Sequence, residues 1–367
     1  MMLYWHGHYS DMASYRHESG DARLTLYSLL MGHGEMTDTL NMRAMMVDSA
    51  NAPLRLVSIA RPVPQAGQVL VRIKASGVNP LDGKIRSGQA AHAGQPLPAI
   101  VGMDLAGTVE ALGEGVSGWL PGDEVYAMAT GIGGIQGSLA EYAAVDARLL
   151  ARKPHNLSMR EAAGLPLVLI TAWEGLVDRA RVRPGQKVLI HGGAGGVGHV
   201  AVQIARAFGA EVFATGSAGQ QSIIEGFGAT FIDYRKSSVE DYVAQHTAGE
   251  GFDIVYDTVG GETLDASFKA ARMYHGHVLS CLGWGQHSLA PLSFRGATYS
   301  GVFTLLPLLT GRGREHHGEI LLEAARLIEA GKLVPLLDPH PFTLQTAEAA
   351  HVLLLSGAAK GRLVVEI

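Results

Sequence analysis

The spacing of apolar residues changes character near residue 158 of the chain. Before that point apolar residues come in short runs with a two-residue period, and every second side chain from Val69 to Ala75 is apolar, as in a half-buried strand. Glycine and proline separate these runs, for example in Arg61-Pro-Val-Pro64. Many short strands divided in this way predict a small barrel-like β domain, with one helical piece over 81–87.

From residue 158 onward, helix and strand patterns alternate. Ser158, with Glu161 three residues later, predicts a capped helix, and a second helix is expected over 165–177. Further strands are expected at 211–215, 230–233, 252–257 and 277–281, with helices between them at 219–227, 238–246 and 262–271. This alternation predicts a parallel sheet with helices on both faces.

The last part of the chain begins with a segment, 283–313, that glycine and proline interrupt. Helices are expected over 318–330 and 346–355, and a strand over 361–367. His316 and His317 stand among glycines and arginines, and we expect them in a solvated turn.

Residues 187–206 contain the most informative motif, a short apolar run followed by a glycine-dense turn and a helical pattern. The glycines at 193, 195 and 198 have the Gly-x-Gly-x-x-Gly spacing, which allows a tight turn, lets a pyrophosphate approach the backbone and brings the helix close to the strand. The free N–H groups and the dipole at the start of the helix favour phosphates. We therefore expect a bound dinucleotide, contacted by the turn residues Gly193, Ala194, Gly195, Gly196, Val197 and Gly198.

Composition narrows the class of protein. The 367 residues are 47% hydrophobic and 17% charged, which supports a large core, and a net charge of −5 without a basic run gives no footprint for nucleic acid. The single cysteine, Cys281, excludes intrachain disulfides and a Cys-rich zinc site, so a reducing cytoplasm is the simplest setting. No apolar run has the length of a membrane span. Residues 1–41 show no period, and we expect a disordered N-terminal extension.

Several blocks together resemble the medium-chain dehydrogenase/reductase superfamily, and most of all its zinc-free quinone oxidoreductase branch, which includes the zeta-crystallins. The blocks are Gly77–Asp82, Gly102–Gly107, Pro121–Val125, Leu169–Trp173, His191–Gly198, Asp257–Gly261 and Lys360–Arg362. The resemblance implies an α/β protein with a GroES-like β-barrel domain, 42–162 and 304–367, and a Rossmann domain with a doubly wound parallel sheet, 163–303.

The residues at the positions of the zinc ligands in this superfamily argue against a catalytic metal. Zinc-dependent members place a cysteine where this chain has Asn79, and a histidine where it has Met103. Neither an amide nor a thioether is a good zinc ligand. We therefore expect no metal, which makes plain alcohol–aldehyde exchange the weaker interpretation.

The cofactor is predicted to be NADPH. The strand expected at 211–215 is not followed by the acidic residue that holds the ribose of NAD. Four residues are candidates to receive the 2′-phosphate of NADP: Ser217, Gln221, Tyr234 and Arg235. The resemblance adds contacts for the rest of the cofactor at Val259, Cys281, Leu282, Gly283, Val302, Phe303 and Lys360.

The resemblance implies reduction of a quinone or an α,β-unsaturated carbonyl by direct hydride transfer to a small hydrophobic acceptor. Negative charge then develops on the acceptor oxygen and needs a donor. Asn79, Lys84 and Thr171 are the candidate catalytic residues, although a turn-forming asparagine, a surface lysine and a helix-bound threonine are the plainer interpretations. No dedicated acid stands out, so water is a possible source of the proton.

Other interpretations stay open. One is a zinc-free alcohol dehydrogenase or an enoyl or alkenal reductase of the same superfamily, and another is a non-catalytic NADPH-binding protein. The segment 128–137 is expected to be flexible and to cover the substrate. The resemblance also implies a homodimer, paired through the Rossmann sheet edge near 283–305.

Overall fold

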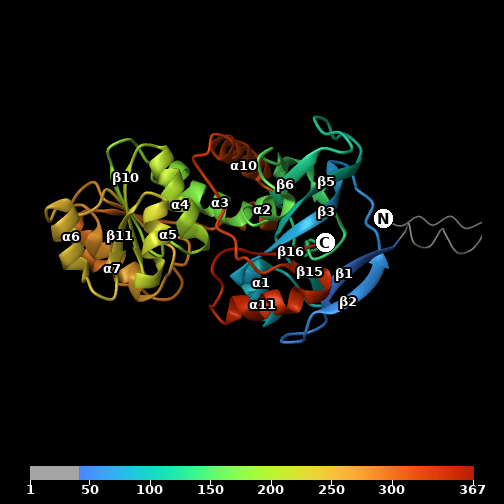
Figure 1. Cartoon of the computed structure of the whole chain (residues 1–367), viewed down its shortest axis with the longest axis horizontal. Coiled ribbons are helices and arrows are strands. Elements are labelled where there is room, and N and C mark those ends of the chain that lie inside the picture. The colour runs from blue at the N-terminus through green and yellow to red at the C-terminus, as the bar shows by residue number, and fades with distance from the viewer. Residues whose placement is uncertain (1–40) are drawn as a thin grey trace, which may run out of the picture. The chain divides into compact units, whose positions relative to one another are not determined.

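The computed structural model describes residues 41–367 (Figure 1), so the extension expected over 1–41 lies outside the described residues except for Asn41. Within them no helix is long and apolar enough to cross a membrane. The α-helices are α1 (Pro80–Arg86), α2 (Met159–Ala163), α3 (Pro166–Trp173), α4 (Gly196–Ala207), α5 (Gln221–Gly226), α6 (Val239–Thr247), α7 (Glu262–Ala270), α8 (Ala290–Arg295), α9 (Leu306–Thr310), α10 (Arg314–Glu329) and α11 (Ala347–Leu355).

The first sheet contains strands from both ends of the described chain. It has the order β15-β16-β3-β5-β6-β8, and β7 also pairs with β3. These strands are β3 (Gln68–Val78), β5 (Asp104–Leu112), β6 (Glu124–Met128), β7 (Tyr142–Asp146), β8 (Ala151–Arg152), β15 (Phe342–Thr343) and β16 (Leu363–Glu366). A smaller sheet, β2-β1-β4, is formed by β1 (Asn41–Val47), β2 (Arg55–Ala60) and β4 (Ala99–Ile100). Because β16 pairs antiparallel with β3, the last residues of the chain lie against its first half.

The second sheet is parallel throughout and has the order β11-β10-β9-β12-β13-β14. Its strands are β9 (Lys187–Ile190), β10 (Glu211–Gly216), β11 (Thr230–Asp233), β12 (Ile254–Asp257), β13 (His277–Ser280) and β14 (Thr298–Gly301). The chain order reverses at β9, with β10 on one side and β12 on the other. This switch point is where open α/β sheets bind ligands, and the glycine turn follows β9 there.

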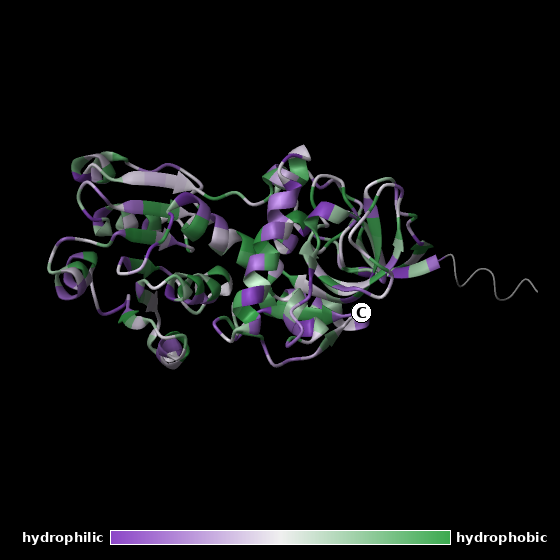
Figure 2. Ribbon diagram, turned by 90° about the horizontal axis from the view of Figure 1, so that it is seen from above, coloured by the Kyte–Doolittle hydropathy of each residue, from purple (hydrophilic) through white to green (hydrophobic). Residues whose placement is uncertain are grey.

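This arrangement confirms the expected fold class, a GroES-like β part with a Rossmann-type sheet. In Figure 2 the inner strands are mostly green, and many of the helices around them show both green and purple, as expected for helices with one buried side. Ser158 caps α2, with its Oγ 3.2 Å from the Glu161 amide that donates to it, as the capping-box spacing predicts. The residue limits given above for the two domains remain predictions.

The helix predicted over 165–177 is interrupted, and the prediction of one regular helix was wrong. α3 ends at Trp173 and continues as a π-helical segment, η3 (Glu174–Arg179). The Tyr256 hydroxyl donates to the Thr171 carbonyl at 2.6 Å, so a side chain from β12 takes a carbonyl of the helix. Insertions of this kind widen a helical turn.

Two further expectations were wrong, and one strand was not expected. The segment 283–313 contains the edge strand β14, whose four residues, Thr-Tyr-Ser-Gly, are too short and too polar to show a strand period. α10 begins at Arg314, so His316 and His317 lie in a helix, and His317 is buried because Gly318 packs directly on the backbone of Arg148.

The segment 128–137 is not a flexible cover. Met128, Ala129, Thr130 and Ile132 are buried, and the Thr130 hydroxyl donates to the Gly102 and Met103 carbonyls at 2.9 and 3.0 Å. No residue of this segment lines the cavity described below. Its apolar side chains belong to the core, which the composition of the segment alone could not distinguish from a ligand-facing surface.

One buried histidine gives a prediction for acid stability. His351 on α11 is 1% exposed, neither ring nitrogen has a partner, and burial lowers its pKa to about 4. In the unfolded chain His351 therefore becomes protonated near pH 6.5, whereas in the folded protein it stays neutral down to about pH 4. The free energy of unfolding falls as the pH drops from 6.5 toward 4. From pH 6.5 to pH 5 this group contributes about 2 kcal/mol of that loss.

Urea unfolding of a His351→Leu variant at several pH values should therefore show a shallower loss toward acid than the parent protein. His275→Leu, at an exposed histidine, is the control and should keep the parental slope. Equal slopes for the parent and His351→Leu would show that His351 does not stay neutral in the fold. The raised pKa of buried acids acts in the opposite direction, so only the difference between variants is informative.

Candidate active site

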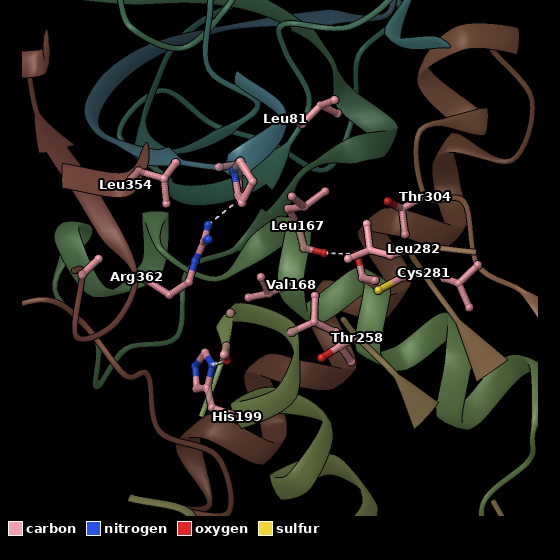
Figure 3. A pocket seen from close by; sticks show the side chains of 18 of the residues that line it. Leu81, Leu167, Val168, His199, Thr258, Cys281, Leu282, Thr304, Leu354 and Arg362 are labelled. Atoms are coloured by element: carbon pink, nitrogen blue, oxygen red, sulfur yellow. Dashed lines mark hydrogen bonds between the residues drawn. The ribbon is translucent and has the colours of Figure 1, made fainter. Parts of the chain in front are cut away.

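A cavity of about 460 Å³ is lined by residues from both parts of the fold, beside the glycine turn after β9 (Figure 3). One wall comes from the first half and the C-terminal segment, and includes Leu81 of α1 and Leu354 of α11. The other wall comes from α4 and the loops after β12, β13 and β14, and includes Thr258, Leu282 and Thr304. Its volume and largely apolar lining are typical of small-molecule sites.

The glycine turn forms the floor of this cavity. Ala194, Gly195, Gly196 and Val197 line it, and Gly195 is the N-cap of the twelve-residue α4, whose first N–H groups are free for an anion. A Cβ placed on Gly196 would be in ordinary van der Waals contact with the Arg362 guanidinium and with Val168, each 3.5 Å away, and would not clash. The turn predicted from the sequence spacing thus lies at the start of α4 and lines the cavity, and its role as a phosphate cradle stays a prediction.

The other two glycines of the motif act in packing. A Cβ on Gly193 would lie 2.6 Å from the Cβ of Ala214, and one on Gly198 would collide with the carbonyl of Gly192. Neither glycine lines the cavity. They bring the turn, β10 and α4 close enough for the cradle to form.

A buried polar network stands behind the opposite wall. Arg362 donates to Asn79 Oδ1 at 2.6 Å and to the Gly164 carbonyl at 2.8 Å, and it lies 3.5 Å from Asp104 Oδ2. Asn79 Nδ2 donates to the same Asp104 oxygen at 2.9 Å. Asp82 accepts from the Asn79 backbone at 2.8 Å. These contacts fix the orientation of the Asn79 amide and leave one hydrogen of its Nδ2 free.

Burial sets the electrostatics of this network. It raises the pKa of Asp82 to about 7 and that of Asp104 to about 6, and it lowers the pKa of Arg362. Asp104 is held by three donors, from Asn79, Arg362 and the backbone of Leu167, all of which favour its charged form. One guanidinium therefore serves two buried carboxyls, and its removal would leave Asp104 without a counter-charge.

The residues present do not fit a zinc ion. Asn79 and Met103 stand where ligands are needed, and the Asn79 amide is already engaged by Asp104 and the Arg362 cation. A metal placed there would lie against a guanidinium. Within residues 41–367 no three His, Cys, Asp or Glu side chains are grouped to hold a metal.

The other side of the cavity combines small polar groups with apolar ones. Cys281, Leu282, Val302 and Phe303 line it, as expected from the sequence. Burial raises the pKa of the Cys281 thiol to about 12, so it stays a neutral, unreactive group. Thr171 also lines the cavity, but its hydroxyl donates to the Leu167 carbonyl at 2.7 Å. Lys84 lines the cavity from the exposed face of α1.

Other predicted contacts do not reach this cavity. The backbone amide of Ser217 donates a hydrogen bond to the side chain of Gln220, and Gln220 does line the cavity. The side chain of Gln221 donates to the Glu225 carboxylate at 2.8 Å. Tyr234 and Arg235 lie together after β11 and are exposed. Val259, Gly283 and Lys360 are likewise absent from the lining. The four phosphate candidates thus follow β10 and β11, at the end of the sheet beside the cradle.

Sequence reasoning missed several lining residues. Arg362 belongs to the block Lys360–Arg362, of which only Lys360 was predicted as a contact; strand alternation could not have distinguished the two, because residues two positions apart share a face. His199 on α4 lines the cavity, and its Nδ1 lies 2.9 Å from the Gly195 carbonyl. His92 and Trp284 carried no signal in the sequence, because isolated aromatic residues in loops have no period.

Two family models and several known oxidoreductases match this chain. Residues 65–155 match the family described as alcohol dehydrogenase GroES-like domain, and residues 227–365 match the one described as zinc-binding dehydrogenase. A chloroplastic NADPH-dependent alkenal/one oxidoreductase of Arabidopsis thaliana is 35% identical over 316 residues, which is 84% of this chain and 74% of the relative. A quinone oxidoreductase of Sus scrofa is 30% identical over 313 residues, 84% of this chain and 91% of that one.

Among solved structures, an alcohol dehydrogenase superfamily protein from Novosphingobium aromaticivorans superposes with a TM-score of 0.87. Its sequence identity to this chain is 56%, and the superposition covers 89% of this chain and 99% of the other. Both halves of the described fold therefore have a counterpart in one protein.

Proposed function

Because the chain belongs to the medium-chain dehydrogenase/reductase superfamily, we propose that it is an NADPH-dependent oxidoreductase that reduces quinones or α,β-unsaturated carbonyls without a metal. The observation that carries the proposal is that the glycine turn lines a largely apolar cavity. In the wall of this cavity Asn79 is hydrogen-bonded to Arg362 and does not belong to a metal site. The two relatives named above are described as acting on these acceptor classes.

The cradle suits a dinucleotide. The first N–H groups of α4 and the guanidinium of Arg362, which lies 3.5 Å from the Cβ position on Gly196, present positive charge to a pyrophosphate. Cys281, Leu282, Val302 and Phe303 would then flank the ring end of the cofactor, where their low polarity excludes water. When bound, the reduced nicotinamide would supply a hydride to an electron-poor carbon of the acceptor.

The chain's own residues would stabilise the charge that develops on the acceptor oxygen. Asn79 has one amide hydrogen left after its bond to Asp104, and it is locked in place by Arg362. Such a preorganised donor needs no reorganisation when charge appears. Lys84 is a second donor at the open side of the cavity. Thr171 lines the cavity, and its hydrogen bond to the Leu167 carbonyl would hold this helix turn in place beside a bound cofactor.

A set of electron acceptors tests the proposal directly. NADPH oxidation, measured at 340 nm with benzoquinones, naphthoquinones and 2-alkenals, is expected to proceed with at least one of these groups. Oxidation with alkenals alone would favour an enoyl or alkenal reductase of the same superfamily. NADPH binding without oxidation by any acceptor would contradict the proposal and leave a non-catalytic binding protein.

The preference for NADPH over NADH gives a separate prediction. No acid follows β10, and Arg235 with Tyr234 stands exposed at the end of the neighbouring strand. Arg235→Ala should raise the KM for NADPH roughly tenfold and leave that for NADH unchanged, because one charge-assisted bond to the 2′-phosphate is lost. Arg326→Ala, at an exposed arginine of α10, is the control. Equal efficiency of the parent protein with both cofactors would contradict the prediction.

Further expectations for the cell are part of the proposal. The single cysteine fits a reducing cytoplasm. The exposed edge of β14 offers unpaired backbone groups for a second copy of the chain, so we expect a homodimer. Light scattering on the purified protein tests the second point.

A further inference from the structure

Three aromatic side chains from distant parts of the sequence meet at the cavity. They are His92 in the short helix η1 (Ala91–Ala93), Trp284 after β13 and Phe303 after β14, and all three line the cavity. The ring centroids of His92 and Trp284 are 5.1 Å apart, those of Trp284 and Phe303 are 6.1 Å apart, and those of His92 and Phe303 are 6.3 Å apart. These spacings are those of interacting aromatic rings. We call the three residues the aromatic cluster.

Trp284 keeps much of its ring surface free in this cluster. Phe303 meets it edge-on, with planes at 86°, and His92 meets it at 35°. Trp284 is still 52% exposed, although the residues before it, Cys281 and Leu282, lie in the cavity wall. A large apolar ring left half uncovered at the edge of a cavity is a surface for another flat molecule.

The loop that carries Trp284 is fixed. His287 Nε2 lies 3.1 Å from the Trp284 carbonyl, and His287 Nδ1 lies 2.9 Å from the Asp265 carboxylate on α7. Because both partners are acceptors, both hydrogen bonds form when both ring nitrogens are protonated, so this environment favours the imidazolium form of His287. The hydrogen bond to Asp265 raises the pKa of His287, in keeping with that state. The tryptophan is therefore held in place before any ligand arrives.

The wall across the cavity is complementary to a flat molecule that carries an oxygen. Leu81 and Leu354 present aliphatic side chains there (Figure 3). Lys84, one turn beyond Leu81, has no hydrogen bond or ion pair through its Nζ among residues 41–367. An apolar ring would lie between the leucines and Trp284, and its oxygen would lie near the ammonium group.

We propose that the aromatic cluster makes the enzyme selective for flat, fused-ring acceptors, such as two-ring quinones, over short acyclic enones. This inference rests on the proposed function and narrows its acceptor class. Trp284 is the specificity-determining residue, since an acyclic enone would leave its ring uncovered whereas a fused ring would stack on it. Stacking on one aromatic face changes binding by roughly five- to tenfold.

The test compares Trp284→Leu, Trp284→Phe and the control Phe294→Leu, which removes an aromatic ring that is 84% exposed and outside the cavity. The value of kcat/KM with NADPH is measured for 1,4-naphthoquinone and for methyl vinyl ketone. Trp284→Leu should lose roughly five- to tenfold on the naphthoquinone and stay within about twofold on the ketone. Trp284→Phe and Phe294→Leu should stay within about twofold of the parent on both.

A binding measurement separates this inference from the proposed function. The dissociation constant of 2-naphthol, a two-ring molecule that accepts no hydride, is measured by calorimetry with NADP⁺ present, and Trp284→Leu should weaken it by the same factor. Equal losses on both acceptors, no loss on either, or unchanged naphthol binding would each overturn the role of the cluster, even in an active reductase. If the parent protein reduces no acceptor, the proposed function fails, and naphthol binding alone decides the role of Trp284.

Discussion

Replacing Arg362 by methionine is expected to lower the free energy of unfolding by about 3–5 kcal/mol, the effect of breaking a buried ion pair by removing one partner. Methionine fills much of the volume of the arginine stem but supplies no charge. Asp104, which is fully buried, would lose its counter-charge, and Asn79 Oδ1 and the Gly164 carbonyl would lose their donor. Urea unfolding followed by circular dichroism measures the loss.

Two further variants distinguish a loss of charge compensation from a loss of side-chain packing. Arg55→Met removes the arginine of an exposed pair with Asp48 and should leave the unfolding midpoint unchanged. Arg362→Met combined with Asp104→Asn should be more stable than Arg362→Met alone, because the uncompensated charge is gone while an amide oxygen can still accept from Leu167. A double variant as unstable as the single one would show that packing of the arginine stem, not charge, stabilises this region.

The same substitution should weaken cofactor binding. Arg362 is the cation beside Gly196, so under the proposed function its loss would remove a charge-assisted contact with a phosphate of the cofactor. We expect the dissociation constant of NADPH, measured by fluorescence at a temperature where the variant is folded, to rise by at least roughly tenfold. An unchanged constant would confine Arg362 to a structural role.

Gly198→Ala is the second change with a large expected effect. Its methyl group would collide with the Gly192 carbonyl, a backbone atom fixed by the turn. α4 must move away from the turn, and overpacking of this kind costs about 1–3 kcal/mol. The free N–H groups of α4 move with the helix, so NADPH binding should weaken by at least roughly tenfold, measured by fluorescence titration.

Gly196→Ala is the matched control two residues earlier in the same helical turn. A Cβ there meets no heavy atom closer than 3.5 Å, so the fold should accept it and gain up to about 1 kcal/mol from helix propensity. Its methyl group would nevertheless lie against the Arg362 guanidinium, which we propose faces the phosphates. The control should therefore unfold no earlier than the parent protein, and only its cofactor binding should change. Two equally stable variants would contradict the packing role given to Gly198.

The sequence predicted those features that depend on residues close together in the chain. The glycine turn after β9, the capping box of Ser158 and Glu161 and the alternation of strands and helices each follow from spacings of a few residues. Prediction failed where the local pattern was weak, or where a side chain distant in the sequence interrupts a regular element. β14 has no period of its own, and the π-helical segment after Trp173 depends on the Tyr256 hydroxyl.

Only the tertiary structure decided which distant side chains meet at the site. Arg362 reaches Asn79 across 283 positions because β16 pairs with β3. His92 meets Trp284 and Phe303 because the loops that carry them line the same cavity. A spacing along the chain cannot encode such contacts, since they depend on which strands pair and in which register. The sequence alone thus determined the fold class and the position of the glycine turn, and strand pairing determined which side chains form the opposite wall.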